Sequence, residues 1–107
     1  MPDLPTRHLV EILLPLFSNA GKRFGREPFD RTRDELLDCF GGITAFTRSP
    51  AEGLWAEEGQ TVRDEVVIFE IVADSIDAAW WTNYRRTLED RFKQESIMIR
   101  SHEVVQL

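Results

Sequence analysis

Cysteine, long apolar runs and positive charge are all scarce in this 107-residue chain. Its one cysteine, Cys39, excludes an internal disulfide and any paired-cysteine metal or redox motif. No apolar run approaches the roughly 20 residues of a membrane-spanning helix, so we expect no membrane partner. The 13 Lys and Arg residues face 19 Asp and Glu, a net charge of -6 that argues against nucleic-acid binding because it repels phosphate.

Apolar residues are nevertheless abundant enough to fold the chain. Hydrophobic residues make up 42% of the sequence and aromatic residues 10%, which predicts a single domain over 1–107 with a modest core. The apolar stretch near the N-terminus is interrupted by Glu11 and has no small-residue cleavage site after it. It therefore predicts a strand and not a signal peptide, and we expect a cytoplasmic protein.

Apolar periodicity and turn residues divide the chain into six elements. We expect a strand over 8–17, a helix over 28–40, a long hairpin over 43–72 that turns near 57–60 and returns along 66–72, a helix from one of Asp74, Ser75 or Asp77 to about Lys93, and a final strand over 96–105.

Each predicted helix carries one apolar stripe at a 3.6-residue period. The first stripe consists of Phe29, Leu36, Leu37 and Phe40. The second consists of Trp81, Tyr84, Leu88 and Phe92. Pro28 suits a first turn, although the run from Thr32 to Glu35 also fits a capping box and a later start. The pair Gly41-Gly42 should end this helix, since glycine adopts the left-handed cap without steric cost.

The order strand, helix, strand, strand, helix, strand is typical of the ferredoxin-like split βαβ arrangement. The sequence therefore predicts an α+β fold, β-α-β-β-α-β, in which a four-stranded antiparallel sheet has two helices on one face. The first and third strands should be central, with the fourth beside the first and the second beside the third.

The segment Ser49–Gly53 interrupts the outgoing arm of the hairpin. Its proline and glycine favour a bulge that protects an edge strand, and a loop gating a ligand is the alternative. Trp55, just beyond, is either a cap on the core or an exposed anchor for a partner.

The predicted central strands are apolar on the face that the helices do not cover. Leu13, Phe17, Val66, Ile68 and Val72 have the parity opposite to the helix side. Such a face should not meet water, so we expect a second copy of the chain, a ligand or another protein to cover it.

Charged residues interrupt this apolar face. Glu11 and Glu70 lie on the two central strands, and Arg100 and His102 lie on the last strand. Arg48 or Thr47 approaches from the hairpin, depending on the register. Two interpretations remain open. These residues form salt bridges across a homodimer interface, Glu70 or Glu11 to Arg100, or they line a pocket for a small apolar ligand.

The two histidines, His8 and His102, are expected to approach one another because the first and last strands pair antiparallel. Strand parity puts their rings on opposite faces, and we therefore expect no metal site. No nucleotide-binding, metalloprotease or serine-hydrolase motif is present, and we expect no cofactor.

Three stretches, GGITAFTRSPAEGLW, RDEVVIFEIV and WWTNYRRTLEDRFKQESIMIR, resemble small bacterial hypothetical proteins of the ferredoxin-like, dimeric α+β barrel type. The resemblance covers most of the chain. It implies this fold and a bacterial cytoplasmic setting, and it transfers no catalytic residue.

Two functions of different classes follow. The first is a homodimeric binding or interaction module that uses the open sheet face. The second is a small dimeric α+β barrel enzyme for an apolar or aromatic molecule, in which Glu70, Arg100 and His102 orient the substrate or move a proton.

Overall fold

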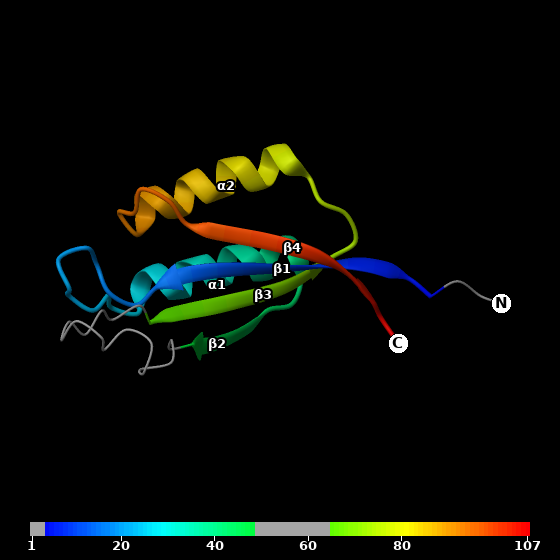
Figure 1. Ribbon diagram of the computed structural model, residues 1–107, viewed down its shortest axis with the longest axis horizontal. Helices are drawn as coiled ribbons and strands as arrows, with labels where there is room; N and C mark the ends of the chain where they lie inside the picture. The colour runs from blue at the N-terminus through cyan, green and yellow to red at the C-terminus, as the bar shows by residue number, and fades with distance from the viewer. Residues whose placement is uncertain (1–3, 49–64) are drawn as a thin grey trace, which may run out of the picture.

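The computed structural model describes residues 4–48 and 65–107 and confirms the predicted order of elements. Along the chain these are β1 (Thr6–Pro15), α1 (Glu27–Phe40), β2 (Thr44–Arg48), β3 (Val66–Ala73), α2 (Ala78–Arg91) and β4 (Met98–Val105) (Figure 1). The turn predicted near 57–60, Ser49–Gly53 and Trp55 lie outside the described residues.

The strands form one antiparallel sheet in the order β2-β3-β1-β4, as predicted. Central β1 pairs with β3 so that Glu11 lies opposite Glu70, and with β4 so that Glu11 also lies opposite Arg100. Both helices cover the same side of this sheet (Figure 1). The result is an α+β fold of the ferredoxin-like type, with β2 and β4 as its edges.

The hydrophobic core lies between the sheet and the helices. Alternate residues of β1, namely Val10, Ile12 and Leu14, are at most 1% exposed and face the helices. Leu88 of α2 and Phe92, the residue that follows this helix, are fully buried beside them. Burial of each such side chain stabilises the fold by about 1.5–3 kcal/mol.

Specific local contacts mark the start of α2 and the end of α1. The side chain of Asp77 caps α2 by accepting a hydrogen bond of 3.1 Å from the Trp80 backbone N–H. Gly41 ends α1 in the left-handed conformation (φ 77°), as predicted, and its N–H bonds to the Leu37 carbonyl at 2.8 Å.

The predicted stripe of α2 is confirmed, whereas that of α1 is partly wrong. Leu37 is 38% exposed, and Thr32 is fully buried in its place. Thr32 is not a capping residue either. Its hydroxyl donates to the Pro28 carbonyl at 2.7 Å inside a helix that already begins at Glu27. Because the hydroxyl has this hydrogen-bond partner within the helix, Thr32 can be buried although the predicted apolar stripe did not include it.

Candidate functional site

Side chains on the open face of the sheet form rows that run across the strands, and three of these rows lie at or next to Glu11. Residues directly opposite one another in antiparallel strands share a face, so the register defines each row. The first apolar row is Phe46, Ile68, Leu13 and Met98. The polar row is Thr44, Glu70, Glu11 and Arg100. The second apolar row is Val72 and Leu9, and it ends on β4 at the polar His102.

Large apolar side chains of these rows are in contact with solvent. Met98 is 57% exposed, Phe46 is 41% exposed and Val72 is 39% exposed. Ile68, between Phe46 and Leu13 in the register, is only 1% exposed although it lies on the side away from the helices. The open face therefore carries apolar side chains on both sides of the polar row, and several of them are exposed, as predicted.

The polar row contains one ion pair and one carboxylate beside it. Arg100 Nε donates to Glu11 Oε1 at 3.3 Å. This salt bridge was expected between two copies of the chain, and it is found within one chain. The Glu11 side chain is 16% exposed. Among the described residues Glu70 has no ion pair, and it is half-buried on the strand next to Glu11.

The structure separates the remaining predicted site residues from this row. His102 lies opposite Leu9, one row away on β4, and is exposed. Arg48 lies opposite Val66 in the register, four residues along β2 from the polar row. The fourth member of the row is Thr44, which sequence reasoning missed because the hairpin register was unknown.

Sequence reasoning also missed a polar network between the two helices. Arg91 Nη1 and Nη2 each bind one oxygen of the Glu35 carboxylate at 2.8 Å, and Nη1 also donates to the Thr32 hydroxyl at 2.8 Å. The Tyr84 hydroxyl donates to Glu35 Oε1 at 3.0 Å. We name these four residues the helix clamp. The position of Arg91 three residues after Leu88, on the buried side of α2, was the signal available in the sequence.

The clamp shifts the pKa of each titratable member. Hydrogen bonds from Arg91 hold the pKa of the Glu35 carboxyl below its ordinary value, against the effect of partial burial. Burial, followed by the hydrogen bond to Glu35, raises the pKa of the Tyr84 phenol. Hydrogen bonds to Glu35 raise the pKa of Arg91. Among the described residues, no buried side-chain nitrogen or oxygen lacks a hydrogen-bond partner, and the clamp fixes α1 against α2.

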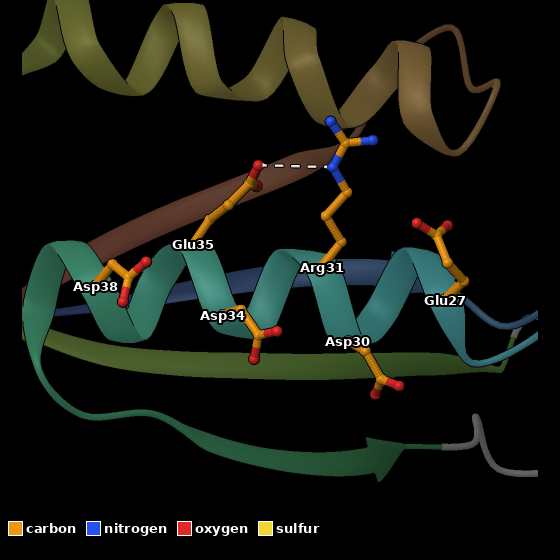
Figure 2. Close-up of a pocket in the computed structure, with 6 residues that line it drawn as sticks. All are labelled: Glu27, Asp30, Arg31, Asp34, Glu35 and Asp38. Atoms are coloured by element: carbon orange, nitrogen blue, oxygen red, sulfur yellow. Dashed lines mark ion pairs between the residues drawn. The ribbon is translucent and has the colours of Figure 1, made fainter.

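A shallow depression of about 600 Å³ lies on the outer surface of α1. Its lining is Glu27, Asp30, Arg31, Asp34, Glu35 and Asp38 (Figure 2). Glu35 and Arg31 rise from α1 toward α2, with Arg31 Nε 4.0 Å from Glu35 Oε2, while Asp30 and Asp34 point away from α2 (Figure 2).

The carboxylates of this depression are largely paired with arginines. Arg33 lies 3.3 Å from both Asp30 and Asp34, and Arg91 binds Glu35. Within residues 4–48 and 65–107, no group of three or more His, Cys, Asp or Glu is arranged to hold a metal ion. We read the depression as a solvated acidic helix face, and the polar row as the better candidate site.

Neither helix of the described ranges has the length and apolarity to cross a bilayer. No family model matches the chain, and no curated protein matches it either. The resemblance to bacterial proteins therefore stays a prediction.

A comparison with solved structures finds the same fold in a phage SAM lyase in complex with S-methyl-5'-thioadenosine. The TM-score is 0.56 at 19% identity, and the match covers 100% of this chain and 91% of the lyase chain. At this identity the likeness establishes the fold alone.

Proposed function

We propose that this protein is a self-associating binding module whose two copies pack together through the open sheet face. The observation that carries the proposal is the solvent exposure of Met98, Phe46 and Val72 on the side of the sheet away from the helices. An antiparallel sheet that faces water normally alternates apolar and polar residues, so an apolar face of this kind favours a cover.

A second copy is the cover that best fits the charges of the face. The polar row carries two carboxylates and one guanidinium, so it presents both signs. A two-fold interface brings the same patch of each subunit together, which requires a surface complementary to itself.

The first test is the mass of the protein in solution, measured by light scattering at low micromolar concentration. We expect a dimer. The Met98→Glu variant should be monomeric because it places a charge in the apolar part of the interface. Leu37→Glu is the matched control, because Leu37 is also exposed, at 38%, but lies on the helix side. A monomeric wild-type protein, or equal dissociation of both variants, would overturn the proposal.

A second candidate function is that of a small-molecule enzyme using the same polar row. The specific observation in its favour is that a protein of this fold over the whole chain is a lyase solved with a thioether nucleoside bound. Glu70 would be the group that attracts a cationic substrate, since Arg100 is already engaged with Glu11.

Calorimetric titration with S-methyl-5'-thioadenosine and with SAM tests this second function. Binding that Glu70→Gln abolishes, with the fold and the dimer retained, would favour an enzyme. Absence of heat with both compounds, together with a stable wild-type dimer, would favour the interaction module.

A further inference from the structure

We infer that the two copies are related by a two-fold axis that is parallel to β1 and lies between the two facing sheets, directly over Glu11. In this arrangement Arg100 of each copy forms an ion pair with Glu70 of the partner subunit. This inference rests on the proposed self-association. It adds the residue pair that fixes the register between the copies.

The first step is the order of charges along the polar row. Glu70, Glu11 and Arg100 occupy three successive strands, β3, β1 and β4, with Glu11 in the middle. Neighbouring strands are about 4.8 Å apart, so Glu70 and Arg100 lie on strands about 10 Å from each other. Opposite charges therefore flank a central position at equal distances.

The second step is the effect of a two-fold axis at that central position. Rotation about an axis along β1 exchanges the two flanks, which places β4 of one copy over β3 of the other. Arg100 then faces Glu70 of the partner subunit, and the reciprocal pair forms by symmetry. An axis between β1 and β3 would instead place Glu11 over a Glu70 carboxylate twice and Arg100 over Thr44, so it would form two like-charged pairs and no ion pair. The axis over Glu11 brings together one like-charged pair, Glu11 and its own symmetry mate, and forms two Arg100–Glu70 pairs.

The third step is to find which apolar residues of the two copies the same rotation brings together. An axis parallel to the strands leaves each row at its own height along them, so each apolar row meets its own copy. Met98 then lies over the position of Ile68 of the partner subunit, beside that subunit's exposed Phe46, and Leu13 meets its own symmetry mate. Sheets packed face to face lie about 10 Å apart, a spacing that these side chains and an extended arginine can fill.

The side chains of the polar row have the freedom that this arrangement requires. The Arg100 side chain is 46% exposed, and its described ion pair uses Nε at 3.3 Å. The terminal nitrogens of Arg100 make no described hydrogen bond within residues 4–48 and 65–107. A guanidinium has five N–H groups, so Arg100 can keep Glu11 and still bind a second carboxylate.

Mixing two charge-reversed variants tests the pairing. In Glu70→Lys copies each Arg100 would meet a lysine, and in Arg100→Glu copies each Glu70 would meet a glutamate. Each variant alone should dissociate at least about tenfold more readily than wild type. An equimolar mixture should form heterodimers of near wild-type affinity. One native Arg100–Glu70 pair and one pair between the introduced lysine and the introduced glutamate, both attractive, then replace two repulsive pairs.

Circular dichroism of each variant verifies folding, since Arg100→Glu places a second carboxylate beside Glu11. If that variant does not fold, a double-mutant cycle of Glu70→Gln and Arg100→Gln replaces the mixture. The inference then requires the double variant to dissociate no more readily than the weaker single variant.

The outcomes separate the inference from the proposed function on which it rests. A monomeric wild-type protein would contradict both the proposed self-association and the axis over Glu11. A dimeric wild-type protein whose charge-reversed variants stay dimeric, or fail to complement each other on mixing, would leave the self-association standing and overturn the axis at Glu11.

Discussion

Arg91 and Glu35 form a bidentate ion pair that joins α2 to α1, with both N–O distances at 2.8 Å. The Arg91 side chain is only 9% exposed. Loss of Glu35 would leave a nearly buried guanidinium with the Thr32 hydroxyl as its remaining partner in the clamp. The clamp therefore links the two helices that share the covered side of the sheet.

Glu35→Gln should lower the free energy of unfolding at pH 7 by about 1–2 kcal/mol, the low part of the range for hydrogen bonds to charged groups, because the carboxylate is partly exposed. Chemical denaturation of both proteins measures the difference. Glu27→Gln is a matched control on the same helix, since that carboxylate has no described ion pair within residues 4–48 and 65–107, and it should change stability little.

The difference in free energy of unfolding between the wild-type protein and Glu35→Gln should disappear in acid. The folded pKa of Glu35 lies below its ordinary value. Its stabilising contribution is therefore fully present above the unfolded pKa of about 4.3 and is lost as the pH falls through the folded pKa. Denaturation between pH 7 and pH 3 should show the wild-type curve approaching that of Glu35→Gln. A constant gap down to pH 3 would contradict this linkage.

Asp77→Ala should destabilise the protein by about 1 kcal/mol because it removes the side-chain cap of α2. Asp74→Ala is the control three residues earlier. Its carboxylate pairs with Arg7 at 2.9 Å, but the Asp74 side chain is 85% exposed, so the loss should stay below that of the cap. Thermal unfolding followed by circular dichroism compares the two, and an equal loss in both would refute the capping role.

The two carboxylates of the polar row should respond differently to neutralisation. Glu70→Gln should weaken self-association several-fold by removing the partner of Arg100. Glu11→Gln should leave it unchanged or strengthen it, because Glu11 meets its own symmetry mate at the proposed axis. Sedimentation equilibrium of the two variants makes the comparison. If Glu11→Gln dissociated more readily than Glu70→Gln, Glu11 and not Glu70 would be the partner of Arg100 across the interface.

The architecture could be predicted from sequence because its signals are local. Residues Trp81, Tyr84, Leu88 and Phe92 recur at helical spacing, and all are buried as expected. Alternation along β1 likewise predicted which side Glu11 faces. The capping glycine Gly41 predicted the end of α1 for a purely conformational reason.

The site was predicted less completely, since it depends on register and on side-chain reach. Which hairpin residue joins Glu70 is decided by the pairing of β2 with β3, and the answer was Thr44 and not Arg48. The helix clamp was missed for a related reason. Arg91 and Glu35 are 56 residues apart, and nothing in either helix alone indicates that they meet.

The position of Cys39 gives the chain a built-in reporter. This thiol is free and exposed, and it lies on α1, on the side of the sheet opposite the proposed interface. A spin label attached there would leave the open face intact. In a face-to-face dimer the two helix layers are the outermost of four layers, so the labels would be separated by at least about 30 Å. Copies that met through their helices would bring the labels much closer, and one interlabel distance would therefore tell the two assemblies apart.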